Sequence, residues 1–358
     1  MRFRLTDDQL HVQDAMRKIA NEPGARDRQR AVIAGREPVD ATLWHRLGEF
    51  GAFGLVVPVG DGGAGATMVE LSLVAEQLGA AAACVPFLGH VLTVIAVVGG
   101  GDAEQRARWL PDLLTGRSIG TVAFAEGDGI WEPRAWTVAG ETEFSGRKIN
   151  VPNASQADLI LVGVEGGDVV VVESSDPGVS IRDMVVNDLT RPLGVVDLDR
   201  ARGTRLVDSL SVAERVRDAG LVLLAADAFG GASRSIEMIV EYTLQREVFG
   251  RKLAEFQAVK HQLADMALEV EPTRGLFWFA AYAFDALQEQ ASLAAALAKA
   301  QISDVYIDVS RRALELYGGL GFSWDHDAHV YMKRAQFDSA WGGRPSIHFN
   351  RAADLAGW

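Results

Sequence analysis

The sequence contains only one cysteine, Cys84, among its 358 residues, so no disulfide can form within the chain. No cysteine or histidine spacing typical of a zinc site is present either. Long apolar runs are also missing, because the stretch Val91–Val98 is far shorter than the ~20 residues that cross a bilayer. Residues 1–8 lack the apolar core of a signal peptide. We therefore expect a cytoplasmic protein with no membrane partner.

Positive charge is scarce as well. The chain has 35 Lys and Arg against 48 Asp and Glu, which gives a formal net charge of −13. Nucleic acids and anionic membranes attract proteins through Lys and Arg, so we expect neither as a partner. A few local arginines can still bind a small anionic ligand in a cleft. With 48% hydrophobic and 23% charged residues, the composition is that of an ordinary soluble globular protein.

Three compositional blocks follow one another and predict an α+β protein that is mainly α. Residues 1–115 carry apolar side chains at helical spacing and predict an N-terminal helical domain. Residues 116–207 contain short β-branched runs, such as Leu159–Val162 and Val169–Val172, separated by Gly and Asp turns. These runs predict a middle antiparallel β barrel or sandwich. Residues 208–358 return to long helical stripes with short connections, which predict a C-terminal helical bundle.

The segment from Arg246 to Gln257 is the most distinctive in the chain. It places Arg246, Phe249, Gly250 and Gln257 at fixed offsets across a glycine break between two helical patterns. Such a break exposes backbone N–H groups beside one guanidinium, whose planar fork can bind two oxygens of a diphosphate. The alternative is that Arg246 simply ends a helix, where a cation interacts favourably with the helix dipole.

This segment resembles the RxxFGxxxxxxQ flavin-binding motif of the acyl-CoA dehydrogenase family. Other segments resemble further motifs of that family in the same order, and together they cover nearly the whole chain. They are Leu55–Pro58 with Gly62 and Gly63, Glu76–Gly79, Gln105–Gly116, Gly146–Lys148 with Ala157 and Asp158, and Leu316–Phe322. The resemblance implies the fold of that family, with helical, β and helical domains in this order.

The resemblance also implies an activity, a cofactor and a set of binding residues. Members of the family use FAD to introduce a double bond between the α and β carbons of an acyl-CoA thioester. By resemblance, Arg246 lies on the FAD pyrophosphate, usually across a subunit boundary, while Phe249 packs beside it and Gln257 reaches the adenosine half. Gly318 and Gly319 are expected to let the FAD of a neighbouring chain approach the backbone. The alternative for this glycine pair is a helix C-cap followed by a turn.

The carboxylate that removes the α proton in this family is missing from the sequence. One family position for the catalytic Glu falls on Gly342, and the position used by other branches falls on Gly220, which precedes Leu221. Neither glycine can accept a proton, so the catalytic residue is unknown. Asp338 is a remote candidate for the base, because it lies one turn before Gly342 if the segment is helical.

The segments expected to hold the flavin ring also depart from the family pattern. Phe124–Gly129 replaces a loop that contacts flavin and substrate in the family. Asn150 and Pro152 replace an aromatic residue and a hydroxyl residue of a strand beside the ring. Glu315 replaces a Gln near the glycine pair, where a carboxylate is unfavourable to a pyrophosphate. The adenosine and pyrophosphate segments are therefore better kept than the ring segments.

This asymmetry resembles the non-catalytic partner in heteromeric acyl-CoA dehydrogenases of actinobacteria that degrade steroid side chains. In those enzymes one chain supplies the base and the other completes the FAD site across the interface. The segment Gly321–His329 resembles the GFTWEHDxH form common in them. Our first hypothesis is thus a heteromeric enzyme that acts on an acyl-CoA with a homologous partner subunit. The other hypotheses are a homo-oligomer with a relocated base at Asp338, Asp325 or Asp327, and a non-redox protein that keeps the fold.

Asp325, His326, Asp327 and His329 form a polar cluster that could suggest a metal site. No cysteine accompanies them, and the family that the chain resembles uses no metal. Asp is a common helix N-cap, so we interpret the cluster as a polar loop in which Asp325 or Asp327 caps the next helix. We expect no metal site in the chain.

Overall fold

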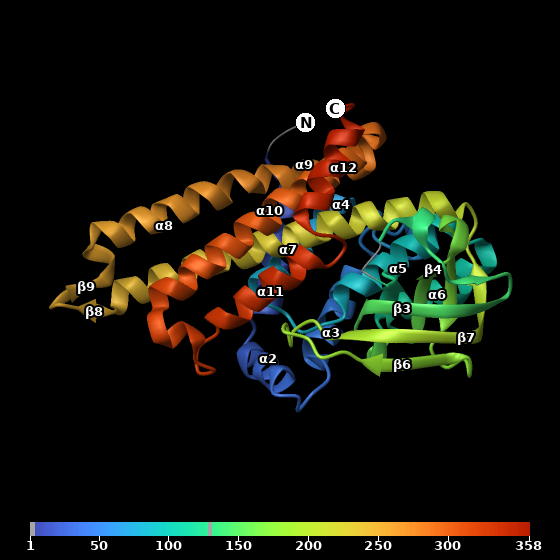
Figure 1. Ribbon diagram of the computed structural model, residues 1–358, viewed down its shortest axis with the longest axis horizontal. Helices are drawn as coiled ribbons and strands as arrows, with labels where there is room; N and C mark the ends of the chain where they lie inside the picture. Colours follow the sequence, from blue (N-terminus) through green and yellow to red (C-terminus); the bar gives the residue numbers. More distant parts are fainter. Residues whose placement is uncertain (1–3, 128–130) are drawn as a thin grey trace. The chain divides into compact units, whose positions relative to one another are not determined.

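The computed structural model describes residues 4–127 and 131–358 (Figure 1). Helices come first, a β region follows, and helices return after it, which confirms the predicted mainly helical α+β class. The helices before the β region are α1 (Asp7–Ala20), α2 (Ala25–Ile33), α3 (Ala41–Phe50), α4 (Met68–Ala80), α5 (Phe87–Gly100) and α6 (Ala103–Thr115).

The β region is one curled sheet. Its strands are β1 (Gly120–Ala123), β2 (Ala139–Gly140), β3 (Glu143–Pro152), β4 (Leu159–Gly163), β5 (Val169–Glu173), β6 (Val179–Asp183) and β7 (Leu193–Arg205). The order is β1-β4-β5-β7-β3-β2, with β6 also paired to β7. Only the β1–β4 pair is parallel among the described strands. An antiparallel bridge between Ala125 and Ile149 joins the end of β1 to β3, so the sheet bends back on itself.

The core of this sheet is aliphatic, as the β-branched runs predict. Those runs lie in β4 and β5, and their side chains pack with residues from β3 and β7. β-branched side chains suit a pleated surface because they pack closely against cross-strand neighbours. The buried cluster comprises Ala123, Val138, Phe144, Val151, Ala154, Ile160, Val162, Val164, Val170, Val172, Val196, Leu198 and Ala201.

The helices that follow the sheet contact one another through a central long helix, α10. It contacts α8, α9, α11 and α12. The helices after the sheet are α7 (Ser209–Gln245), α8 (Gln257–Val270), α9 (Arg274–Ala286), α10 (Gln288–Tyr317), α11 (Ala328–Ala340) and α12 (Pro345–Leu355). Within the described residues, none of the helices is long and apolar enough to span a membrane.

The chain forms two compact units. One comprises Met1–Asn21, Ser72–Ala83 and Leu221–Trp358, and the other comprises Glu22–Leu71 and Cys84–Gly220. The first unit therefore contains most of the C-terminal helices, and the second contains the whole curled sheet. The division into domains at 115 and 207 stays a prediction.

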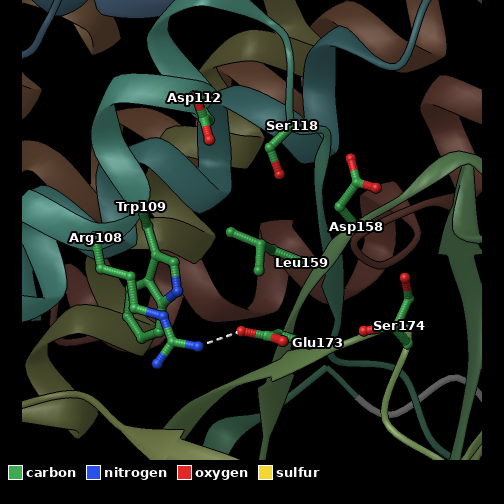
Figure 2. A pocket seen from close by; sticks show the side chains of 9 residues that line it. Arg108, Trp109, Asp112, Ser118, Asp158, Leu159, Glu173 and Ser174 are labelled. Atoms are coloured by element: carbon green, nitrogen blue, oxygen red, sulfur yellow. Dashed lines mark hydrogen bonds and ion pairs between the residues drawn. The ribbon is translucent and has the colours of Figure 1, made fainter.

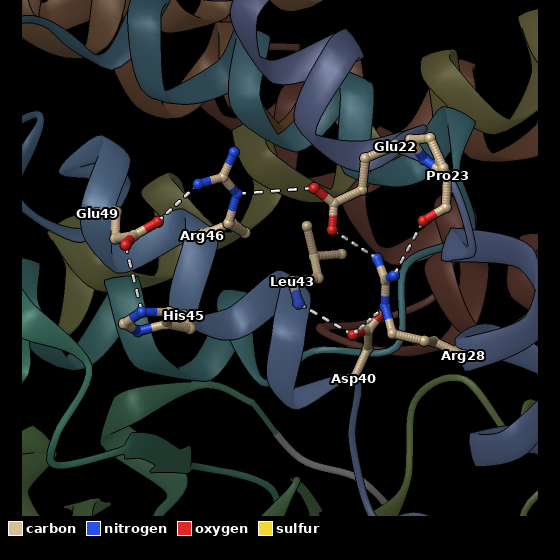
Figure 3. A network of polar contacts seen from close by, with 8 residues as sticks. All are labelled: Glu22, Pro23, Arg28, Asp40, Leu43, His45, Arg46 and Glu49. Atoms are coloured by element: carbon tan, nitrogen blue, oxygen red, sulfur yellow. Dashed lines mark hydrogen bonds and ion pairs between the residues drawn. The ribbon is translucent and has the colours of Figure 1, made fainter.

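A polar network joins α2 to α3 in the second unit (Figure 3). Asp40 accepts a hydrogen bond from the backbone N–H of Leu43 at 2.9 Å and so caps the start of α3. The same carboxylate accepts the Arg28 Nε–H at 2.9 Å. Glu22 binds Arg28 at 3.0 Å and lies 3.6 Å from Arg46. One buried carboxylate thus fixes both the cap and the neighbouring helix.

We expect Asp40→Ala to lower the free energy of unfolding by about 2 kcal/mol, because it removes the cap and leaves Arg28 without this partner. Asp40→Asn keeps an oxygen for the Leu43 N–H and should lose clearly less. Urea unfolding of the two variants beside the wild type measures the difference. Equal losses in both variants would contradict a capping role for Asp40.

Candidate dinucleotide site and base position

The distinctive segment folds as a two-residue β-hairpin. Strand β8 (Glu247–Val248) pairs with β9 (Arg251–Lys252), and Phe249 and Gly250 form the turn between them. Their φ angles are +52° and +77°, the combination that suits the right-handed twist of a hairpin. Phe249 is 92% exposed at this tip, although a non-glycine residue rarely adopts positive φ. The turn therefore presents a large apolar side chain outward.

Arg246 lies at the base of this hairpin with its backbone fixed on both sides. Its N–H donates to the Tyr242 carbonyl at 2.8 Å, and its carbonyl accepts the Leu253 N–H at 2.8 Å. Its side chain is exposed, and within residues 4–127 and 131–358 no hydrogen bond or ion pair involves the guanidinium. An anchored backbone with an unengaged guanidinium suits the binding of an anion from outside the chain.

Gln257 begins the next helix, α8, and is exposed. Phe256 occupies the N-cap position and makes no side-chain capping bond. The Arg251 guanidinium lies over the Phe256 ring, 3.9 Å from its centroid. An uncapped helix start presents free N–H groups and a partial positive charge, which favour an anionic group.

Gly318 and Gly319 follow the end of α10 and are both exposed. Gly318 has φ +62°, and a Cβ atom built on either glycine would meet no atom within 4 Å. Another chain or a ligand can therefore approach this backbone closely. Arg246, the start of α8 and this glycine pair each have features that can receive an anionic group, and their joint binding of a dinucleotide stays a prediction.

The family resemblance expects a base at Gly342 or at Gly220, and the surroundings of Gly342 are apolar. Gly342 follows α11 with φ +76°, and a Cβ built on it would lie 3.6 Å from Leu224 Cδ1 and 3.7 Å from Leu221 Cδ2. Gly220 directly precedes Leu221 in α7. Leucines thus surround the place of the missing carboxylate, and the backbone there has a conformation that favours glycine.

Asp338 lies in the interior of the helical unit. It is completely buried in α11. Burial lowers the pKa of Lys299 on α10 to about 8, and the negative charge of Asp338 opposes this shift. Asp325 is exposed, and Asp327 takes the N-cap position of α11 without a side-chain capping bond. His326 Nδ1 instead accepts the Ala328 N–H at 3.1 Å. The cluster therefore forms a polar helix start, as expected, but the histidine makes the capping bond that we predicted for an aspartate.

The segment that replaces the flavin-contacting loop is held by the β region's own polar groups. Glu126 accepts hydrogen bonds from the Thr137 N–H at 2.8 Å and the Thr137 hydroxyl at 2.6 Å, and it pairs with the buried Lys148. Burial would raise the pKa of Glu126, but the bonds from Lys148 and Thr137 hold it below its ordinary value. Burial lowers the pKa of Lys148 to about 8. Asp128 and Gly129 of this segment lie outside the described residues.

The second unit also contains a cavity of about 280 Å³ (Figure 2). Its lining residues are mostly polar and come from α6, β4, β5, the loops that follow α6 and β5, and the residue before β4. Arg108 pairs with Glu173 across it, and Asp158 accepts the Ile119 N–H at 2.8 Å. The residues that line the cavity are Arg108, Trp109, Asp112, Ser118, Asp158, Leu159, Glu173, Ser174 and Ser175. This polar hollow does not suit an acyl chain.

Comparison with known proteins decides the family. Residues 6–117 match the model of the acyl-CoA dehydrogenase N-terminal domain, and residues 210–356 match that of the acyl-CoA dehydrogenase C-terminal domain. A variant of the Tcur3481-Tcur3483 steroid ACAD is 30% identical, with a TM-score of 0.91 over 98% of each chain. The chain belongs to the acyl-CoA dehydrogenase family.

Two further relatives place the chain within this family. Acyl-CoA dehydrogenase IpdE2 of Mycolicibacterium smegmatis is 28% identical over 97% of this chain and 98% of its own length. The ChsE4–ChsE5 complex of Mycobacterium tuberculosis is 25% identical, with a TM-score of 0.91 over 100% of this chain and 99% of that one. The predicted similarity to heteromeric actinobacterial acyl-CoA dehydrogenases is confirmed, and family membership supports FAD as the cofactor.

Glu315 has a partner on its own helix, Arg311, which also pairs with Asp308 at 2.8 Å. Arg311 lies 2.6 Å from the Glu315 carboxylate, one turn earlier on α10. This pair offsets the negative charge beside Gly318 and Gly319.

Among the residues that the structure describes, no grouping of His, Cys, Asp and Glu could hold a metal ion.

We expect Arg311→Ala to weaken FAD binding roughly threefold, because the uncompensated Glu315 then repels the diphosphate, and exposed pairs contribute little. The double variant Arg311→Ala, Glu315→Gln should bind as the wild type does. Fluorescence titration of the assembled protein with FAD measures both. An undiminished affinity in the single variant would contradict a screening role for Arg311.

Sequence reasoning missed two buried side chains of the helical unit, Lys299 and His348. Lys299 lies in α10 and His348 in α12, and both reach the turn that contains Gly342. The sequence carried a signal for the first of them. Lys299 is the single charge in an otherwise apolar run between Ala294 and Gln301.

Proposed function

We propose that this chain is the partner subunit of a heteromeric, FAD-dependent acyl-CoA dehydrogenase. The enzyme would introduce an α,β double bond into an acyl-CoA thioester, and a homologous subunit would supply the catalytic carboxylate. The observation that carries the proposal is Gly342, which the family resemblance aligns with the base position and which has a positive φ beside Leu221 and Leu224. No side chain at this place can accept the α proton.

The dinucleotide loops define what the chain contributes. Arg246 would bind the FAD pyrophosphate with its fork of N–H donors, and the start of α8 at Gln257 would add backbone donors near the adenosine half. Phe249 would pack beside the cofactor, and Gly318 with Gly319 would let it approach the backbone. When bound, FAD supplies the acceptor for the hydride that leaves the β carbon.

The exposure of these groups supports a site shared with another chain. Phe249 is exposed at a strained hairpin tip, and the Arg246 guanidinium has no partner among the described residues. The segments that would hold a flavin ring in this chain are occupied differently, since Glu126 pairs with Lys148 and Thr137. We therefore place the complete FAD site at an interface with the partner.

Asp338, Asp325 and Asp327 are poor candidates for a relocated base. Asp338 is completely buried beside Lys299. This burial would keep its carboxylate away from any substrate. Asp325 and Asp327 lie in the loop before α11, three residues or fewer from its start. We infer that the partner removes the α proton and that this chain shapes the site. The similar steroid ACAD suggests a bulky acyl-CoA as the first substrate class to test.

The absorbance spectrum of the purified chain, alone and after co-purification with a homologous partner subunit, tests this proposal. We expect a colourless chain alone and a yellow complex that an acyl-CoA bleaches under anaerobic conditions. A chain that is stably yellow alone and bleaches with an acyl-CoA would favour the homomeric enzyme. Absence of FAD from both preparations would favour a non-redox protein that keeps the fold.

A further inference from the structure

A buried lysine binds the turn that replaces the catalytic residue. Lys299 is completely buried, and its Nζ lies 3.1 Å from the Ser339 carbonyl, 3.5 Å from the Gly343 carbonyl and 3.2 Å from Ser303 Oγ. An ammonium group has three donors, so these three oxygens can use all of them. Burying a charge is costly, and an apolar side chain would avoid that cost. The negative charge of Asp338 offsets part of this cost, and the lysine directs its donors at two carbonyls of the turn and one hydroxyl.

A buried histidine holds the same turn from the other side. His348 Nε2 lies 3.0 Å from the Gly342 carbonyl. Because a carbonyl only accepts, Nε2 must carry the hydrogen, which makes Nδ1 the bare nitrogen of a neutral ring. Burial, with the positive charge of Lys299 as the second cause, lowers the pKa of His348 to about 4. The histidine is thus a neutral donor at physiological pH.

The backbone of this turn leaves the helical path of α11. Gly342 and Gly343 follow each other with φ +76° and +108°, which glycine adopts readily, and the Gly343 N–H donates to the Ala340 carbonyl at 3.2 Å. Lys299 from α10 and His348 from α12 together bind the carbonyls of Ser339, Gly342 and Gly343. This arrangement fixes the side of Gly342 that faces Leu221 and Leu224.

We propose that Lys299 and His348 are positioning residues that clamp the turn at Gly342 and keep an apolar wall where the family carries its base. This inference rests on the proposed function, because the wall matters only if an acyl group lies against it. The clamp acts through the backbone, and neither side chain touches the substrate.

The indole of Trp341 reports directly on this turn. Trp341 precedes Gly342, is buried, and stacks on Phe337 with ring centroids 6.1 Å apart. The chain labelled with 5-fluorotryptophan gives a ¹⁹F signal for Trp341, assigned through Trp341→Phe. We expect His348→Ala and Lys299→Met to shift and broaden this signal. His348→Gln retains an amide donor and should leave the signal at its wild-type position.

Ser310→Ala provides the matched control, because it removes a buried hydroxyl from the same helix, α10, where it binds the Ile307 carbonyl. It should leave the Trp341 signal in place. A signal unmoved by His348→Ala, or moved equally by His348→Gln, would overturn the clamp. The histidine pair decides the matter even if Lys299→Met does not fold.

The functional half of the inference is tested in the assembled enzyme. We expect His348→Ala to raise KM for the acyl-CoA several-fold and to change kcat less, while His348→Gln stays near the wild type. Unchanged KM in His348→Ala would overturn the role of the wall. Failure of the complex to bind FAD would instead overturn the proposed function and would leave the Trp341 result standing.

Discussion

Replacing Arg246 with alanine is expected to weaken FAD binding by the assembled enzyme roughly 10- to 100-fold. A hydrogen bond to a charged group contributes about 1.5–3 kcal/mol, and 1.4 kcal/mol corresponds to tenfold in affinity. The guanidinium has no partner within the described chain, so its removal should not lower the melting temperature. A loss of cofactor without a loss of stability distinguishes a ligand-binding arginine from a structural one.

Titration of the apo complex with FAD measures this effect. Arg246→Lys keeps the charge but loses the planar fork, so its affinity should lie between those of the wild type and the alanine variant. Arg17→Ala is the control, because Arg17 is an exposed arginine that pairs with Asp14 on its own helix. If Arg246→Ala binds FAD as tightly as Arg17→Ala does, Arg246 is a solvent-facing helix end and the proposed site is wrong.

The largest loss of stability is expected from Arg334→Met. Arg334 is completely buried in α11, and its Nη1 lies 3.1 Å from the Asp227 carboxylate on α7. Its Nη2 donates to the Ala83 carbonyl at 2.8 Å. Breaking a buried pair from one side leaves an uncompensated charge, which costs about 3–5 kcal/mol. The variant should therefore unfold at much lower urea concentration than the wild type.

The double variant Arg334→Met, Asp227→Asn separates the ion pair from simple packing. It removes the stranded charge as well, so it should recover a large part of the stability that the single variant loses. Urea unfolding followed by far-UV circular dichroism measures both. A loss below about 1 kcal/mol in Arg334→Met, within the range of exposed pairs, would contradict a buried structural pair.

The order of the elements was predictable because the apolar period changes twice along the chain. β-branched runs such as Leu159–Val162 and Val169–Val172 became β4 and β5, and the Gly250 break became a tight hairpin. These features depend on residues that are adjacent in the sequence, and such residues determine local backbone conformation. The single parallel pair, β1 with β4, depends on distant strands and could not be seen in the sequence.

The surroundings of the base position were not predictable for the same reason. Asp338 and Gly342 would share a face only if the helix continued, but α11 ends at Ala340 and Gly342 has positive φ. Asp338 is completely buried beside Lys299, a packing that depends on α10 and could not be seen in the sequence of α11. Lys299 and His348 come from α10 and α12, and only the fold brings them to one turn.

Anaerobic reduction of FAD by an acyl-CoA in the assembled enzyme tests most directly whether this chain supplies a proton acceptor. The comparison uses complexes that carry Asp338→Asn, Asp325→Asn or Asp327→Asn in this chain and a Glu→Gln change at the family position of the partner. We expect the three aspartate variants to bleach at the wild-type rate and the partner variant to lose bleaching while it retains FAD. Loss of bleaching in a folded, FAD-bound aspartate variant of this chain would contradict the proposal.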